Sequence, residues 1–145
     1  MKINLDIVNI LEYEATQSNH PNAKISAAVV YRSKIISIGH NMMKSSPFQK
    51  KYGKNKDAIY FHAEINAIHK AIQLGYDKFH KSTLYVVRVK WDGSYKNKLI
   101  HGLAKPCGDK NCGCTNAILR YDFKNVIYTL DEIEGFDKHF GIIQK

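Results

Sequence analysis

The sequence predicts an α/β protein in which helices pack on a mixed β-sheet, and two observations support this fold class. Residues 82–90 form a near-continuous apolar run rich in β-branched residues, which is typical of a central strand. Segments with helical spacing of apolar residues also alternate with strand-like segments, in the order α, β, β, α, β, α, β. From residue 61 onward this alternation implies crossover connections, whose helices pack on a face of the sheet.

The chain up to residue 41 predicts one helix followed by a β-hairpin. Residues 3–18 carry apolar side chains at helical spacing, so we expect one buried stripe, formed by Ile3, Ile7, Ile10, Leu11 and Ala15. Residues 25–31 and 35–38 are strand-like, and the short segment Arg32-Ser33-Lys34 between them predicts a hairpin turn.

Residues 42–60 are the least regular part of the sequence. A loop of this length is uncommon in a compact domain and is often functional. We therefore interpret it as one wall of a substrate pocket, with candidate phosphate contacts at Lys44, Lys50, Lys51, Lys54 and Lys56. The alternative, a solvated loop with no ligand, stays open.

The next helix is expected over residues 61–74, where Gly75 is a natural C-terminal stop. Its buried face is expected to consist of Ile65, Ile68, Ala71 and Ile72. After the strand at 82–90, residues 91–105 are interpreted as a loop with a turn at Asp92-Gly93.

The last part of the chain predicts a short helix over residues 114–121, which buries Ala117, Ile118 and Leu119. Residues 125–130 form the next strand. Beyond it, the last strand of the sheet is either absent or supplied by residues 140–143. An exposed sheet edge invites self-association, so we expect a homo-oligomer.

The composition is that of an ordinary globular protein, with 145 residues, 44% of them hydrophobic and 24% charged. We expect a single domain spanning residues 1–145 with its own core. No apolar run approaches the ~20 residues that cross a bilayer, and the N-terminus lacks the apolar segment of a signal peptide. We therefore expect a cytoplasmic protein with no membrane association.

The formal net charge of +9 suits an anionic partner. Of the 22 Lys and Arg residues, only Arg32, Arg88 and Arg120 are arginines, although planar recognition of phosphates and bases favours arginine. The charge thus supports a nucleotide or nucleic-acid substrate without choosing between them.

Two short segments carry the candidate chemistry. The first is His62-Ala63-Glu64 at the start of a predicted helix, and the second holds all three cysteines, Cys107, Cys112 and Cys114, within eight residues. In a reducing compartment such a cluster binds metal more often than it forms disulfides. One histidine and two thiolates leave the fourth position of a tetrahedral zinc ion for water, as catalytic sites require. The alternative is a set of incidental thiols on a loop.

Glu64 lies two residues from the candidate ligand His62. Zinc acidifies its water to near neutral pH, and a carboxylate beside that water can take its proton and pass it on. This pairing is what hydrolytic deamination needs. The alternative for Glu64 alone is a solvated glutamate stabilised by the helix dipole.

These residues follow the pattern H-x-E, then P-C and a second cysteine, and the sequence resembles the zinc-dependent cytidine/deoxycytidylate deaminase superfamily. The resemblance covers about residues 24–130, including Gly39-His40-Asn41. It implies a three-layer α-β-α fold with a mixed central sheet, with His62 as a zinc ligand and Glu64 as the proton shuttle. It also implies that Asn41 contacts the substrate, at its sugar, and that the backbone at Ala63 holds the base.

The spacing of the cysteines departs from the family pattern Cys-x-x-Cys, because six residues separate Cys107 from Cys114. Cys112 is the competing ligand. We favour Cys114, because Ala117-Ile118 then falls where similar family members place Ala-Ile in the following helix. Counting from Cys112 would also put Gly113 in the first helical turn, at a cost of ~1 kcal/mol relative to alanine.

Three functions follow from these features. The first is deamination of free cytosine nucleotides, dCMP to dUMP above all, as in the small deoxycytidylate-type enzymes, whose phage-encoded members act in the host cytoplasm. The second is deamination of cytosine in single-stranded DNA or of adenosine in RNA, with Trp91 and Tyr95 as candidate stacking residues. The third is a zinc-stabilised binding module, which would have no use for Glu64.

Overall fold

The computed structural model describes residues 2–21, 23–44, 46–53, 60–132 and 138–144. Its helices are α1 (Leu5–Ala15), α2 (Pro47–Lys51), α3 (Ala63–Gln73) and α4 (Gly113–Tyr121), with a 3₁₀ turn at Phe79–Lys81. Its strands are β1 (Lys24–Tyr31), β2 (Lys34–His40), β3 (Thr83–Trp91), β4 (Leu99–Gly102), β5 (Asn125–Thr129) and β6 (Phe140–Gln144). The predicted α/β class and the first hairpin are confirmed.

The sheet is mixed, with five strands side by side in the order β2-β1-β3-β5-β6 and β4 paired to β3 outside this path. The pairing of β3 with β5 is parallel, and all other pairs are antiparallel. A parallel pair needs a crossover, and α4 provides it between β3 and β5. β3, with the predicted near-continuous apolar run, is the central strand.

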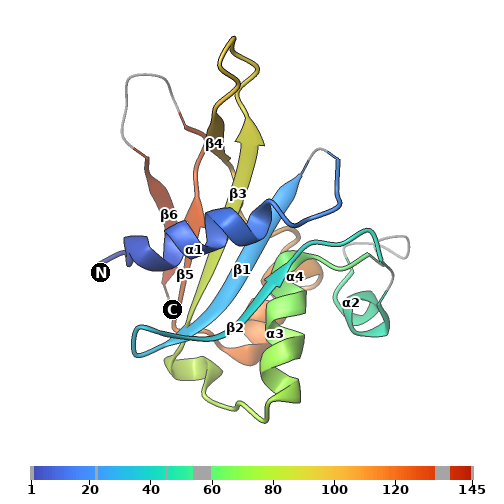
Figure 1. Ribbon diagram of the computed structural model, residues 1–145. Helices are drawn as coiled ribbons and strands as arrows, with labels where there is room; N and C mark the ends of the chain where they lie inside the picture. Colours follow the sequence, from blue (N-terminus) through green and yellow to red (C-terminus); the bar gives the residue numbers. More distant parts are fainter. Residues whose placement is uncertain (1, 22, 45, 54–59, 133–137, 145) are drawn as a thin grey trace.

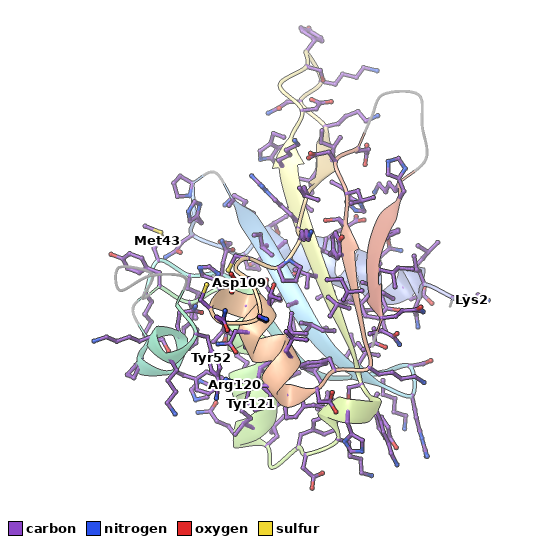
Figure 2. The ribbon with its side chains drawn as sticks, turned by 180° about the vertical axis from the view of Figure 1, so that it is seen from behind. Lys2, Met43, Tyr52, Asp109, Arg120 and Tyr121 are labelled. Atoms are coloured by element: carbon purple, nitrogen blue, oxygen red, sulfur yellow. The ribbon has the colours of Figure 1, made fainter. Side chains whose placement is uncertain are left out.

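Helices cover both faces of the sheet, which makes three layers. On one face, α3 and α4 pack against Ala27 and Val29 of β1 and Leu84 and Val86 of β3. On the other face, α1 packs against alternate residues of the same strands, and Figure 1 shows it lying across them. Figure 2, seen from behind, shows α4 in front of the sheet. The start of α3 and the start of α4 therefore meet on the same side of the sheet.

The buried residues of the helices differ from the predicted ones at several positions. Ile7, Leu11 and Ala15 of α1 are buried as expected, but Ile10 is exposed, and Val8 takes its place in the core. Ile72 of α3 and Leu119 of α4 are also exposed.

The segment 91–105, predicted to be a loop, instead forms the outer half of a β-hairpin. Leu99–Gly102 pair antiparallel with Arg88–Trp91, and the hairpin projects beyond the other strands (Figure 1). Asp92 closes its turn by accepting hydrogen bonds on Oδ1 from the backbone amides of Ser94 and Lys98. The predicted turn at Asp92-Gly93 is thus present, but it joins two strands.

Residues 140–144 form β6, so the alternative in which this segment supplies the last strand is confirmed. β2 and β6 are the outer strands of the sheet. Self-association through such an edge stays a prediction. Within the described ranges, no helix is both long enough and apolar enough to cross a membrane.

Candidate active site

Three side chains from separate parts of the chain converge at the starts of α3 and α4. His62 is the N-cap residue of α3, Cys114 lies in the first turn of α4, and Cys107 precedes that helix. Their ligand atoms all lie within 4.8 Å of one another. The His62 Nδ1 atom is 3.5 Å from the Cys107 Sγ atom and 3.4 Å from the Cys114 Sγ atom.

This cluster fits a zinc ion. A tetrahedral zinc with ordinary bond lengths separates its nitrogen and sulfur ligands by about 3.6 Å, which is close to both observed distances. The donor set of one imidazole and two thiolates also suits zinc. Because the cluster offers three protein ligands, a fourth position remains for a reacting molecule.

Cys112, the competing ligand, lies outside this cluster. Its sulfur is 3.7 Å from the Oδ1 atom of Asp109. α4 begins at Gly113, one residue earlier than predicted, so Gly113 is in the first turn after all. Its φ of +76° is a left-handed value that glycine adopts readily, so the predicted cost of a glycine does not decide between the cysteines.

The six residues between Cys107 and Cys114 form a tight turn that brings Cys114 back beside Cys107. The backbone amides of Asp109 and Cys112 each donate to the other residue's carbonyl oxygen, at 3.0 and 3.3 Å. Gly108 has a φ of +81°, and a Cβ atom there would lie 2.1 Å from the carbonyl oxygen of Cys112. Figure 2 shows Asp109 on this turn, at the start of α4. The turn bulges outward and leaves both sulfurs side by side.

The pKa values of the two clustered cysteines are shifted in opposite directions. The hydrogen bond with Cys114 lowers the pKa of Cys107 to about 4, so Cys107 is a thiolate. The same hydrogen bond, together with burial, raises the pKa of Cys114 well above its usual range. The hydrogen bond between His62 and the Cys107 sulfur raises the pKa of His62, against the opposing effect of burial.

Glu64 lies in the first turn of α3, two residues from His62, with only 5% of its surface exposed. Burial raises the pKa of its carboxyl group above the usual range. A buried carboxyl group with a raised pKa can hold and release a proton near neutral pH, which a solvated glutamate does poorly. The predicted alternative of a solvated Glu64 is wrong.

Hydrogen bonds from neighbouring elements hold the start of α3. The backbone amide of His62 donates to the Oε1 atom of Gln49, a fully buried residue of α2, at 2.9 Å. Asn66 donates from its side chain to the carbonyl oxygen of His40 at 3.0 Å. A Cβ atom at Gly39 would lie 2.6 Å from the backbone nitrogen of Ala67, so this glycine lets α3 lie directly on β2.

A cavity of about 460 Å³ opens onto the cluster and is lined by His62, Glu64 and Cys107. Asn41 and Ala63 line it as well. The Asn41 side chain accepts a hydrogen bond from the amide of Ile25 and donates one to the carbonyl oxygen of Ala23. These bonds fix Asn41 beside the cavity; its contact with a substrate sugar, like that of Ala63 with a base, stays a prediction.

The segment 42–60 contributes to the cavity through Met42, Met43 and Tyr60. The lysines predicted for phosphate behave differently. Lys44, Lys50 and Lys51 do not line the cavity. All three are exposed, and Lys50 and Lys51 lie on α2. Lys54 and Lys56 lie outside the described residues.

The predictions missed four residues that line the cavity. One of them, Arg88, lies on β3. The other three, Leu103, Ala104 and Lys105, follow β4 directly. A single arginine within a strand has no spacing or neighbour in the sequence that marks it as a site residue.

Solved structures with the same fold include three deaminases. A cytidine deaminase from Burkholderia pseudomallei matches with a TM-score of 0.62 at 16% sequence identity, over 99% of this chain and 93% of that protein. A dCMP deaminase from cyanophage S-TIM5 matches with a TM-score of 0.55 at 20% identity, over 88% and 84%.

The third is a diaminohydroxyphosphoribosylaminopyrimidine deaminase/5-amino-6-(5-phosphoribosylamino)uracil reductase from Thermotoga maritima, with a TM-score of 0.56 at 23% identity. The match covers 85% of this chain but only 28% of that protein. No curated protein matches the chain. At these identities the structures show the fold alone.

The sequence profile of the cytidine and deoxycytidylate deaminase zinc-binding region matches residues 1–130. This range contains the whole His62–Cys107–Cys114 cluster, Glu64 and the cavity beside them. The chain therefore belongs to the cytidine and deoxycytidylate deaminase zinc-binding family.

Proposed function

We propose that the chain is a hydrolytic deaminase of cytosine nucleotides that converts dCMP and water to dUMP and ammonia. That it is a zinc-dependent deaminase follows from the family and from the His-Cys-Cys cluster. The observation that carries the proposed reaction is the buried carboxyl group of Glu64 beside that cluster, at the inner end of a cavity of about 460 Å³. Cavities of this size are typical of sites for small molecules.

Zinc, when held by His62, Cys107 and Cys114, supplies a Lewis acid that brings the pKa of water to near neutral. Glu64 then has two tasks. Its carboxylate takes a proton from the water whose oxygen bonds to C4 of the cytosine ring, and passes that proton to the ring nitrogen N3. It next takes the remaining proton from the oxygen now bonded to C4 and carries it to the amino group on C4, so that the C4–N bond breaks, ammonia leaves and the oxygen stays as the C4 carbonyl.

The raised pKa of Glu64 supports this role. A shuttle must accept a proton in one half of the reaction and release it in the other, so its pKa should lie near the working pH. Burial moves the pKa of the Glu64 carboxyl group in that direction. Asn41, fixed by two backbone hydrogen bonds, is the candidate contact for the sugar, and the backbone at Ala63 is the candidate contact for the base.

One observation favours a polynucleotide substrate as the second candidate. Trp91 and Tyr95 lie on the projecting hairpin with 57% and 104% relative exposure. Exposed aromatic side chains beside basic residues are typical stacking platforms for unpaired bases. In this alternative the enzyme deaminates cytosine in single-stranded DNA or adenosine in RNA.

The deciding experiment measures ammonia release by zinc-loaded protein, offered dCMP, CMP, deoxycytidine, a cytosine-containing single-stranded DNA and an adenosine-containing RNA in parallel. We expect turnover of dCMP with both polynucleotides untouched. Turnover of a polynucleotide alone would favour the second candidate, and zinc binding without any turnover would favour a binding module.

The Glu64→Gln variant tests the proton shuttle. We expect its kcat to fall by about 10²–10⁴-fold, the usual contribution of general acid–base catalysis, because the amide holds no transferable proton. Zinc content should stay unchanged, as measured by metal analysis of the purified variant. Undiminished activity would contradict the role of Glu64.

Three expectations accompany this proposal: a single domain over residues 1–145, action in the cytoplasm, and a homo-oligomer. Light scattering on the purified protein measures the subunit number directly. A monomer at micromolar concentration would contradict the third expectation.

A further inference from the structure

The cavity has an uneven charge. Among its described lining residues, Glu64 is the single acidic side chain, and it lies at the inner end beside the metal cluster. The arginine and the lysine of the lining come from another wall of the cavity, Arg88 from β3 and Lys105 from the segment after β4. An anionic group of a bound molecule would therefore be attracted to that wall.

Arg88 lies at the cavity end of an inward-facing row on β3. Leu84 and Val86 of this row are buried against α3 and α4, and Arg88 comes two residues later on the same face. It pairs with Ile25 of β1, and directly opposed residues share a face of the sheet. Ile25 also lines the cavity, and its amide is the group that Asn41 binds. Arg88 is thus a near neighbour of the candidate sugar contact.

The Arg88 side chain is held in place over β4. Gly102 is its partner in the β3–β4 register, and a Cβ atom at Gly102 would lie 3.1–3.3 Å from the Cγ, Cδ and Nε atoms of Arg88. The glycine therefore leaves the space in which the arginine lies. The Arg88 backbone amide also donates to the Thr129 Oγ1 atom at 3.0 Å, which fixes β3 against β5 at this point.

The guanidinium group of Arg88 makes no hydrogen bond or ion pair within the described part of the chain, although its positive charge helps to lower the pKa of Asp131. Its Nε atom is buried and makes no hydrogen bond there. None of the ion pairs found among the described residues includes it. The nearby carboxylate of Asp131 instead binds the Lys90 ammonium and the amide of Leu103. A buried donor without a partner is costly, and a bound anion would relieve that cost.

We propose that Arg88 binds the phosphate on the sugar of the substrate and so makes the enzyme select a nucleotide over a nucleoside. This inference rests on the proposed function. With the base at the metal cluster and the sugar near Asn41, the phosphate lies toward the wall that carries Arg88. The planar guanidinium group matches phosphate oxygens with two parallel hydrogen bonds, which the ammonium group of a lysine cannot make.

The test compares Arg88→Gln with Lys96→Gln, which removes the same charge from the exposed turn of the same hairpin. For Arg88→Gln we expect kcat/KM for dCMP to fall about 10- to 100-fold, as for the loss of charged hydrogen bonds, while kcat/KM for deoxycytidine changes less than about twofold. Lys96→Gln should leave both values unchanged. Arg88→Lys, which keeps the charge and the long stem, should fall between wild type and Arg88→Gln.

Equilibrium binding of the products gives a readout that does not depend on turnover. Calorimetry should show weaker binding of dUMP to Arg88→Gln and unchanged binding of deoxyuridine. Equal losses for nucleotide and nucleoside would mean that Arg88 only maintains the cavity and would overturn the inference, as would equal dUMP binding in wild type and Arg88→Gln.

The failure of the proposed function is distinguishable from the failure of this inference. If the wild-type protein releases no ammonia from dCMP but binds dUMP through Arg88, the phosphate contact stands and the proposed reaction fails. If Arg88→Gln loses activity on a single-stranded oligonucleotide and not on dCMP, the phosphate belongs to a strand, and selection of a free nucleotide is overturned.

Discussion

Two turns, one between the cysteine ligands and one at the tip of the β3–β4 hairpin, differ in what surrounds them rather than in their backbone. The turn at residues 108–113 joins two metal ligands, and the turn at 92–98 joins β3 to β4. Gly108 and Gly93 have nearly the same left-handed φ, +81° and +73°. A Cβ atom would lie 2.1 Å from a carbonyl oxygen at Gly108, but it would meet nothing within 4 Å at Gly93.

This difference indicates which of the two turns tolerates changes in sequence. The inner turn is packed against itself, so the positions of the sulfurs tolerate little change in sequence. The hairpin turn is exposed to solvent and is held by the hydrogen bonds of Asp92. Its residues can therefore change without disturbing the metal site. We therefore expect the turn between the cysteine ligands to tolerate fewer substitutions than the turn of the hairpin.

The largest expected effect comes from the cysteine ligands. Cys114→Ser should lose most bound zinc and reduce ammonia release more than about 10³-fold, because the reaction needs the metal. Cys112→Ser, the matched control two residues away, should keep about one zinc per chain and full activity. Metal analysis of both variants decides between them, and loss of zinc in Cys112→Ser would reverse the ligand assignment.

The second prediction concerns pH. Zinc must displace the proton of Cys114, whose pKa is raised, and the fraction of His62 that is protonated, whereas Cys107 is already a thiolate. Zinc affinity should therefore rise with pH, by roughly one to two decades per pH unit between pH 6 and 8. Chelator competition across this range measures the slope, and a pH-independent affinity would contradict the raised pKa of Cys114.

The exposed turn should not respond over the same pH range. The hydrogen bonds from Ser94 lower the pKa of Asp92, so its carboxylate stays ionised from pH 6 to 8 and its contacts are lost only in acid. The hairpin therefore serves as an internal reference for the inner site. Its backbone amides, followed by NMR, should keep their chemical shifts while those near Cys114 move.

The third prediction compares the two glycines directly. Gly93→Ala should cost only the left-handed conformation, about 1–2 kcal/mol. Gly108→Ala should cost clearly more and weaken zinc binding, because the Cys112 carbonyl has to move. Thermal or denaturant unfolding of the zinc-loaded variants measures the difference, and equal losses would contradict the packing of the inner turn.

The smallest effect is expected at the tip of the hairpin. Tyr95→Ala should change the free energy of unfolding by less than about 0.5 kcal/mol, because the side chain is fully exposed. Turnover of dCMP should be unchanged. Weaker binding of a single-stranded oligonucleotide, measured by fluorescence anisotropy, would instead support the polynucleotide alternative.

The inner site was predictable from the sequence because its residue types are few and distinctive. His62, Glu64 and the cysteines stand out in any environment, and two helix starts place them together. The bounds of α3 and α4 were predicted to within two residues, since the apolar spacing marks both helices and Gly75 marks the end of α3. The choice between Cys112 and Cys114 followed from helix register, although the additional reason based on Gly113 was wrong.

The outer wall could not be predicted in the same way. Residues 92–98 are polar, and β4 has only four residues, so the local pattern indicates a loop and conceals the strand pairing. Arg88 interrupts an apolar run and resembles a strand-end residue until the register places it opposite Ile25. The exposure of Ile10, Ile72 and Leu119 likewise depends on how each helix packs, which no single segment reveals.

The separation of His62 and Cys107 by 45 residues has a consequence for the synthesis of the protein. A growing chain offers the metal only one of the three ligands, His62, until the central strand and the start of α4 have left the ribosome. Bringing such distant ligands together costs chain entropy, and the formation of the sheet has already compensated for that cost. Metal loading is therefore expected late, after most of the fold has formed, so that the nascent polypeptide does not hold zinc in a partly built and indiscriminate site.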